Sequence, residues 1–256
     1  YWSRGLGDVY KRQDKKNIEA AVEGSLKRLN TDYIDLYQLH WPDRPLNIFG
    51  GGLGAYKHYD LESIEISETL EVLSEIVKTG KVRNIALSNE TPWGLSEFIN
   101  KSETLNFPRV QSVQNAYNLL NRTYEYGMSE FAHRSSVGLL AYSPLAQGYL
   151  SGKYLNGAMP KGSRTQLFGR GQRYETPAAE KSIQAYVDYA KKIDMDPSVM
   201  ANAFVNSRDF VTSNIIGATT MEQLKLAIGS WEVKLSEEDF KEFDTIHAAC
   251  LLYTSD

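Results

Sequence analysis

The sequence predicts an α/β protein built on a parallel sheet, and three observations lead to this prediction. Short apolar runs with strand-like spacing alternate along the chain with longer amphipathic runs that have helical spacing. Five strand-like runs can be counted, and their apolar character is typical of strands covered by helices. No Gly-x-Gly-x-x-Gly sequence follows any of them, which argues against a Rossmann dinucleotide-binding domain.

Helix and strand patterns alternate regularly in the first half of the chain. Asp14 is placed to cap a helix whose buried face includes Ile18, Val22, Leu26 and Leu29. A Gly- and Pro-rich loop is expected over residues 41–66. The other elements are strands over 33–40, 82–88 and 110–114 and helices over 67–80 and 91–101.

The second half of the chain is predicted to contain two more strands, each flanked by helices, and one long loop. The Pro residues that follow Thr176 and Asp196 indicate the first turns of two helices. Glu125 is expected to begin an earlier helix, and Thr220 and Ser236 are expected to cap the last two. The strands are predicted over 137–142 and 214–218, and the loop over 145–176.

Composition excludes several classes of protein. The 256 residues are 42% hydrophobic and 23% charged, which is ordinary for a globular chain. The net charge is −4 with no basic stripe, so nucleic acid is not an expected partner. No apolar run approaches the ~18 residues that span a bilayer, and the single Cys250 cannot form an internal disulfide. We therefore expect a cytoplasmic protein without a membrane partner.

Polar or aromatic residues follow all five predicted strands. In a parallel βα barrel the carboxyl ends of the strands point to one face, where the active site is built. The pattern therefore predicts one site, although polar residues also begin many loops that have no function. These residues are His40, Ser88-Asn89, Gln114-Asn115, Tyr142-Ser143 and Gly217-Ala218-Thr219.

Longer motifs resemble the aldo-keto reductase family over about residues 14–247. The resemblance implies a (β/α)8 barrel that binds NADP(H) across the carboxyl face of its strands and transfers hydride to an aldehyde or ketone. The motifs include Thr31-Asp-Tyr-Ile-Asp-Leu-Tyr-Gln-Leu-His-Trp-Pro, Ile85-Ala-Leu-Ser-Asn-Glu-Thr, Val113-Gln-Asn-Ala-Tyr-Asn, Leu140-Ala-Tyr-Ser-Pro-Leu, Leu150-Ser-Gly-Lys-Tyr-Leu-Asn-Gly-Ala and Ile216-Gly-Ala-Thr-Thr-Met-Glu-Gln-Leu-Lys.

The resemblance assigns a catalytic role to one residue of this chain. His40 matches the family histidine that donates a hydrogen bond to the substrate carbonyl oxygen, and Trp41 matches a substrate-pocket residue. A hydrogen-bonded core histidine and a packed tryptophan are the structural alternatives. In the family a Tyr supplies the proton, and its acidity is tuned by Lys and Asp.

The resemblance also implies a set of residues that bind the cofactor. Ser88, Asn89 and Gln114 match the residues that bind the nicotinamide carboxamide, and Tyr142 matches the aromatic that stacks on the ring. A helix N-cap is the alternative role for Ser88-Asn89, and a buried barrel aromatic is the alternative for Tyr142.

The phosphate-binding residues implied by the resemblance lie in the second half. A capping box with Thr220 is the alternative for Gln223, and Ala227 replaces an Asn that contacts adenine in relatives. Arg170 and Arg173 are interpreted as solvated. The pyrophosphate loop matches Ser143, Leu145, Gln147, Gly148 and Lys153, with Arg164 closing over the cofactor, and the 2′-phosphate end matches Gly217, Thr219 and Gln223.

The ends of the chain do not resemble the family. The family Tyr, Lys and Asp lie on its first three strands, which would precede Asp14, and Tyr1, Tyr10 and Lys11 are not on those strands. The sequence therefore predicts an incomplete (β/α)8 TIM barrel with about five of eight strands. The expected parts are a non-family segment 1–13, a partial barrel 14–247 and a non-family tail 248–256. Such a fragment is expected to be inactive.

Two other functions are weighed against a reductase of small carbonyl substrates. The first is a non-catalytic NADP-binding barrel subunit, because the cofactor residues are retained and the acid is missing. The second is a metal-dependent hydrolase, which is disfavoured because no His/Asp cluster has ligand spacing, so no metal site is predicted. The loop that contains Phe49, Tyr56, His58 and Tyr59 is expected to shape the substrate pocket.

Overall fold

A computed structural model describes residues 13–44, 46, 62–169 and 174–252. Within these residues five strands form one sheet in the order β1-β2-β3-β4-β5, and β1/β2 and β2/β3 are parallel pairs. The predicted α/β class is confirmed, and the arrangement is consistent with an incomplete (β/α)8 barrel. The strands are β1 Ile34–Leu39, β2 Val82–Ser88, β3 Val110–Ala116, β4 Gly138–Tyr142 and β5 Val211–Ile215.

The chain divides into two compact units, each of which is described by itself. The first unit consists of residues 1–115 and 127–139, and the second unit of residues 116–126 and 140–256. The division falls inside the segment 14–247 that the sequence assigns to one partial barrel. That assignment stays a prediction.

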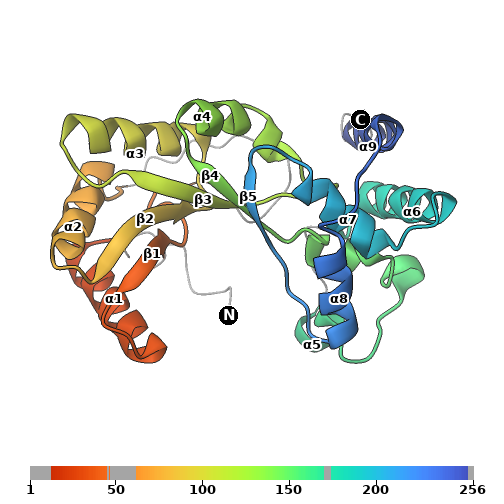
Figure 1. Cartoon of the computed structure of the whole chain (residues 1–256), viewed down its shortest axis with the longest axis horizontal. Coiled ribbons are helices and arrows are strands. Elements are labelled where there is room, and N and C mark those ends of the chain that lie inside the picture. Colours follow the sequence, from red (N-terminus) through yellow and green to blue (C-terminus); the bar gives the residue numbers. More distant parts are fainter. Residues whose placement is uncertain (1–12, 45, 47–61, 170–173, 253–256) are drawn as a thin grey trace. The chain divides into compact units, whose positions relative to one another are not determined.

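Helices α1 (Lys15–Leu29), α2 (Ile66–Lys78) and α3 (Pro92–Thr104) lie along one side of the strands in the first unit (Figure 1). α1 packs against α2, and α2 packs against α3. Asp14 caps α1 as predicted, because its carboxylate accepts a hydrogen bond from the Asn17 N–H at 2.8 Å.

The predicted apolar face of α1 is buried at three of its four large positions. Ile18, Val22 and Leu26 are buried, whereas Leu29 is 63% exposed. The expectation for Leu29 is wrong because this residue ends the helix, and the chain leaves through Asn30 in a left-handed conformation with φ 53°.

The register of the first three strands brings their carboxyl ends together. Leu39 of β1 lies opposite Leu87 of β2, and Ser88 lies opposite Gln114 of β3. His40 directly follows the paired Leu39. Because parallel strands end at the same edge of a sheet, three of the predicted site residues share one edge of the first unit.

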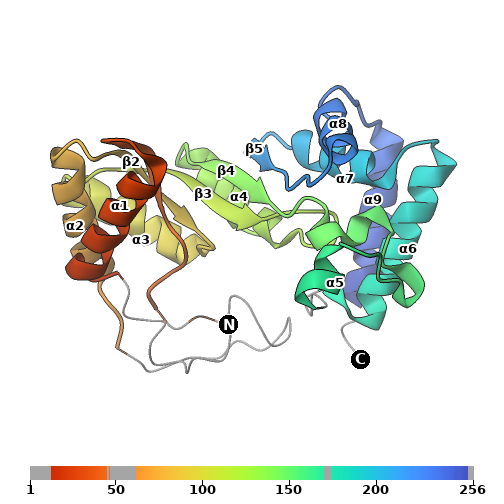
Figure 2. The same ribbon diagram turned by 90° about the horizontal axis from the view of Figure 1, so that it is seen from below.

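The second unit is mainly helical. Its larger helices are α6 (Pro177–Lys192), α7 (Pro197–Asn206), α8 (Met221–Gly229) and α9 (Glu237–Leu252). α6 lies beside α9, and α7 lies beside α8 (Figure 2). The rings of Phe204 and Phe243, both fully buried, meet edge to face with centroids 5.7 Å apart. This aromatic core holds the helices together.

Two predicted elements before α6 differ from the structure. The helix expected from Glu125 begins at α4 (Met128–Arg134), because a 3₁₀ turn ends at Glu125 and Gly127, with φ 82°, separates the two. The expected loop over 145–176 contains short helical segments. No periodic spacing of hydrophobic residues predicts them. They are η2 Ala146–Ser151, η3 Leu155–Gly157 and α5 Arg164–Phe168.

The last strand is also displaced from its predicted position. It was expected over 214–218, whereas β5 covers Val211–Ile215. The β-branched pair Val211-Thr212 enters the strand, and the chain leaves it before Gly217, which has no side chain to pack on a sheet. Gly217 and Thr219 therefore lie in a loop beyond the strand. Among the described residues, no helix has the length and apolar character required to cross a bilayer.

Candidate functional site

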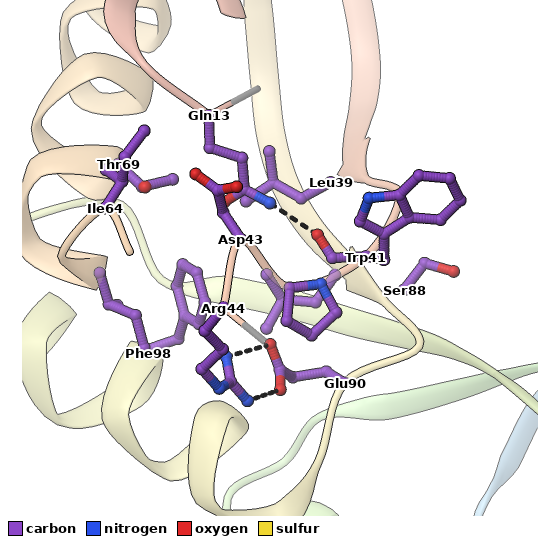
Figure 3. Close-up of a pocket in the computed structure, with 13 residues that line it drawn as sticks. Gln13, Leu39, Trp41, Asp43, Arg44, Ile64, Thr69, Ser88, Glu90 and Phe98 are labelled. Atoms are coloured by element: carbon purple, nitrogen blue, oxygen red, sulfur yellow. Dashed lines mark hydrogen bonds and ion pairs between the residues drawn. The ribbon is translucent and has the colours of Figure 1, made fainter. Parts of the chain in front are cut away.

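His40 lies at the carboxyl end of β1 with its side chain exposed. Its ring stacks on Trp41 with centroids 4.4 Å apart and an angle of 22° between the planes. The carbonyl of His40 accepts a hydrogen bond from Asn89 Nδ2 at 2.8 Å, and the carbonyl of Trp41 accepts one from Gln13 Nε2 at 2.6 Å (Figure 3). The backbone of His40 is thus attached to the turn after β2, while its ring stays accessible.

Ser88, Asn89 and Gln114 form one hydrogen-bonded group. Ser88 Oγ and the Asn89 N–H both donate to the carbonyl of Gln114, at 2.8 and 3.0 Å. Asn89 Nδ2 also donates to Ser88 Oγ at 3.1 Å. Asn89 has a left-handed φ of 56°, which aims its side chain back at the strand ends. Thr91, rather than Ser88 or Asn89, caps α3.

Gln38 belongs to this group, although the sequence analysis missed it. Its Nε2 donates to Gln114 Oε1 at 3.2 Å, while its own Oε1 is buried with no hydrogen-bond partner in the described residues. A buried acceptor without a donor costs roughly 1–3 kcal/mol, so this oxygen is a costly feature of the strand end. The sequence held one signal for Gln38. Side chains two positions apart on a strand face the same side, and Gln38 lies two positions before His40.

Arg44 and Glu90 form a second group that the sequence analysis missed. Arg44 Nη1 donates to Glu90 Oε2 at 3.2 Å, and Arg44 Nη2 donates to Glu90 Oε1 (Figure 3). The two side chains are only 14% and 2% exposed. Both residues follow strand ends, but 46 positions separate them, so the sequence alone gives no reason to pair them.

A cavity of about 20 Å³ lies between these strand ends and the helices α2 and α3. Trp41, Ser88, Arg44 and Glu90 contribute to its lining, together with the buried Asp43 (Figure 3). A space of this size holds about one water molecule. It is therefore a packing feature beside the site and too small for a substrate or cofactor.

Tyr142 and Ser143 follow β4 in the second unit. The carbonyl of Tyr142 accepts a hydrogen bond from the Tyr117 N–H at 3.2 Å, and the Tyr142 side chain is half-buried. Ser143 has a left-handed φ of 59°, and its carbonyl accepts a hydrogen bond from the fully buried Asn118 at 2.9 Å. Asn118 is another residue that sequence reasoning missed.

The predicted pyrophosphate loop has an unusual backbone. Ala146, Gln147 and Gly148 have successive φ values of 47°, 60° and 97°. The loop bonds to itself at its start, where the Ala146 N–H donates to the Ser143 carbonyl at 2.8 Å. A Cβ at Gly148 would lie 3.0 Å from Lys153 Cε, so a glycine allows the lysine chain to approach. Leu145 is half-buried, and its carbonyl accepts the Gly148 N–H at 2.8 Å.

The remaining predicted cofactor residues lie exposed on the second unit. Arg164 is the first residue of α5, and Gly217 lies in the loop after β5. Gln223 Oε1 accepts hydrogen bonds from Thr219 N–H at 2.9 Å and from Thr219 Oγ1 at 3.1 Å. Thr220 caps α8 by accepting from the Gln223 N–H. The structural role considered for Gln223 is thus present, with its side chain reaching Thr219 instead of Thr220.

Tyr37 is half-buried, and Tyr117 and Tyr124 are buried. Burial raises the pKa of Tyr37 and that of Tyr124. Burial also raises the pKa of Tyr117, and the charge of Arg208 offsets only part of this effect. A phenol with a raised pKa is a weaker acid, so burial does not favour proton donation by these three side chains.

Several predicted features lie outside the described residues. They are the pocket loop with Phe49, Tyr56, His58 and Tyr59, and the two arginines Arg170 and Arg173. Within the described part of the chain, no three His, Cys, Asp or Glu side chains gather into a group that could hold a metal ion.

Comparisons with known proteins agree with the family suggested by the motifs. The sequence model of the Aldo/keto reductase family matches residues 5–248. The chain is 46% identical to Protein tas of Escherichia coli (strain K12) over 234 residues, which are 91% of this chain and 67% of that protein. It is 38% identical to an aldo-keto reductase of Babesia bovis, covering 88% of this chain and 82% of that protein.

A more distant relative extends the same pattern. The uncharacterized oxidoreductase YrpG of Bacillus subtilis (strain 168) is 31% identical over 229 residues. The match covers 90% of this chain and 63% of that protein.

Proposed function

Since the chain belongs to the aldo/keto reductase family, we propose that it binds NADPH and forms part of a reductase of small aldehydes or ketones. The family places it among oxidoreductases that act on small carbonyl compounds. The observation that carries the proposal is the group of amides and hydroxyls at the carboxyl ends of β1, β2 and β3. The proposal covers NADPH as cofactor, the residue roles and the activity of the whole protein.

The first unit supplies the groups that would hold the nicotinamide carboxamide. Asn89 and Gln114 present amides, Ser88 presents a hydroxyl, and Gln38 Oε1 lacks a donor. A primary carboxamide offers two N–H donors and one carbonyl acceptor, which is the complement of this set. Because these groups are already linked by hydrogen bonds, little reordering is needed on binding.

The second unit supplies groups suited to phosphate. The loop that contains Gln147 and the ammonium group of Lys153 would hold the pyrophosphate. The amino end of α8, beside Thr219, would favour the 2′-phosphate through the helix dipole. Tyr142 would stack on the nicotinamide ring. Arg164 would approach the phosphates from α5.

The reaction needs a hydride, an oriented carbonyl and a proton. NADPH, when bound, supplies the hydride. His40 would donate a hydrogen bond to the substrate oxygen, so that negative charge is stabilised there as it develops. Trp41, stacked on His40, would limit the positions that a substrate can take. No residue of this chain is matched to the family Tyr, Lys and Asp, so we expect cofactor binding without appreciable turnover.

Fluorescence titration of the purified chain with NADPH and NADH tests the proposal. We expect saturable quenching by NADPH and weaker binding of NADH, which lacks the 2′-phosphate. Absence of NADPH binding by a folded chain would overturn the proposed function.

A second measurement separates the reductase from a non-catalytic nucleotide-binding subunit. Turnover of a test aldehyde is compared for the chain alone and for a chain extended by the Tyr- and Lys-bearing segment of a relative. We expect turnover only in the extended protein. An extended protein that binds NADPH but does not reduce the aldehyde would favour the non-catalytic subunit.

A further inference from the structure

We propose that Arg44 and Glu90 form a positioning pair that holds the turn Ser88-Asn89 in the conformation that receives the nicotinamide. This inference rests on the proposed function, because it concerns how the chain builds its carboxamide site. Neither residue is assigned contact with the cofactor. Their effect acts through Asn89, which directly precedes Glu90 in the chain.

The pair connects two segments that are distant in sequence. Arg44 lies four residues after His40, and Glu90 lies two residues after Ser88. The guanidinium group contacts both carboxylate oxygens of Glu90 and also donates to Thr91 Oγ1 at 3.0 Å. It lies 5.0 Å from the centroid of the Trp93 ring. Four contacts from one side chain thus fix the segment after β1 against the turn after β2.

The backbone of Glu90 is held from its other side by Asn115. The Glu90 N–H donates to Asn115 Oδ1 at 3.1 Å, and Asn115 Nδ2 donates to the Glu90 carbonyl at 2.8 Å. Both the side chain and the backbone of Glu90 are therefore fixed. Because Asn89 directly precedes Glu90, these bonds also limit where the Asn89 backbone can lie.

The conformation of Asn89 is held by its surroundings. Its φ of 56° is left-handed, a region that Asn adopts more readily than other non-glycine residues. The same residue bonds to the carbonyl of His40 and to Ser88 Oγ. If Glu90 moves, both bonds and the orientation of the Asn89 amide change together.

Gly94 provides a way to disturb the pair without changing its charge. A Cβ at this position would lie 2.1 Å from Glu90 Oε1 and 2.2 Å from Arg44 Nη2. These distances are far below contact, so an alanine at Gly94 must displace the ion pair. The absence of a side chain on this turn of α3 is therefore a condition for the observed geometry.

The test compares Glu90→Gln and Gly94→Ala with the unaltered chain. Asp35→Asn is the matched control, because Asp35 pairs with Arg83 across the same two strands while both side chains are exposed, 73% and 56%. Each protein is titrated with NADPH and with 2′-phospho-ADP-ribose. The second ligand keeps the pyrophosphate and the 2′-phosphate of NADPH but has no nicotinamide. Thermal unfolding is followed in parallel.

We expect Glu90→Gln and Gly94→Ala to weaken NADPH binding about tenfold, since the hydrogen bonds made by the Asn89 amide are lost. Binding of 2′-phospho-ADP-ribose should change by less than about twofold, because the proposed phosphate residues lie in the second unit. Asp35→Asn should leave both affinities unchanged. A purely structural role would instead lower both affinities in parallel with thermal stability.

A double variant covers the case in which a lone buried charge prevents folding. Arg44→Met with Glu90→Met removes both charges and is expected to fold, because apolar residues often replace a buried ion pair without loss of stability. It should still show the selective loss of NADPH affinity. A double variant with unaltered NADPH binding would overturn the positioning role.

The possible results separate this inference from the proposed function. If the unaltered chain binds no NADPH, the proposed function fails and the positioning role fails with it. If the unaltered chain binds NADPH and the variants lose both ligands equally, or neither, only the positioning role is overturned.

Discussion

The two units differ in how they present the residues assigned to the cofactor. In the first unit Ser88 and Asn89 are 5% and 8% exposed and are bonded to each other and to β3. In the second unit Lys153, Arg164, Thr219 and Gln223 are exposed. Under the proposed function, a neutral amide would be recognised by fixed, buried hydrogen bonds. Phosphates, which are attracted over longer distances, would be bound by exposed partners.

Local architecture explains this difference. The residues of the first unit lie at paired strand ends, where the sheet register and the packing of α2 and α3 limit their movement. Those of the second unit lie in short helical segments and loops with many positive φ angles. Each of the following changes tests whether the contrast reflects ligand chemistry or only a difference in packing.

The largest effect is expected from removing a core aromatic in the second unit. Phe204→Ala should lower the free energy of unfolding by about 3–5 kcal/mol, because the ring is fully buried against Tyr117 and Phe243. Urea denaturation measures this change. Phe168→Ala is the control, since that ring is 79% exposed. A small effect at Phe204 would mean that the second unit is loosely packed. Loose packing, and not ligand chemistry, would then explain why its assigned residues are exposed.

A smaller effect is expected for the buried amide of the first unit. Asn89→Ala should weaken NADPH binding roughly tenfold to a hundredfold, because the bonds to His40 and Ser88 and the bond to the carboxamide are lost together. Asn84→Ala is the control on the same strand, where the amide bonds to the carbonyl of Asp35 at an exposed position. Equal effects of the two changes would contradict a specific role for Asn89.

The exposed lysine of the phosphate loop should matter less and should depend on salt. Lys153→Ala is expected to weaken NADPH binding about threefold in dilute buffer and by a smaller factor at about 0.5 M salt, since exposed charges are screened. Titrations at the two salt concentrations measure this. Lys161→Ala, in the same loop and also exposed, should have no comparable effect. Salt-independent loss at Lys153 would break the contrast between the units.

The smallest effect concerns pH and a carboxylate of the second unit. Burial acts to raise the pKa of Asp239, but hydrogen bonds from Tyr189 and Ser236 outweigh it, so the pKa lies below its ordinary value. A lowered folded-state pKa contributes stability above the unfolded value of about 3.9, and this contribution is lost as pH falls through the folded value.

Asp239→Asn should therefore lose slightly less stability than the unaltered chain between pH 7 and pH 3. We expect a difference below about 1 kcal/mol, because the group is only half-buried and water still screens it. Urea denaturation at both pH values checks it. If Asp239→Asn lost more stability than the unaltered chain between pH 7 and pH 3, the lowered pKa of Asp239 would be contradicted.

Much of the fold could be predicted because its signals are local. Asp14 and Thr220 cap helices as expected, and Thr176 and Asp196 begin the helices that their following Pro residues indicated. A cap depends on a side chain and an N–H two or three residues away, so it is a local signal. β2 was predicted to the residue. β5 was misplaced because two neighbouring runs compete, and only packing decides which one joins the sheet.

The site was only partly predictable for a related reason. Strand-end positions revealed His40, Ser88 and Gln114, because parallel strands always bring such residues to one edge. Gln38 and Asn118 contribute through partners that are distant in the sequence. Their residue types are common in any loop or strand, so nothing local distinguishes them.

The sequence by itself determined the α/β class, most helix starts and the family of this protein, because apolar periods, caps and motifs are properties of short segments. Only the tertiary structure decided that Arg44 meets Glu90, that Asn89 is held at positive φ and that Gly94 must remain without a side chain. These features depend on which segments pack together. Burial turns ordinary polar residues into fixed partners by removing water as the alternative.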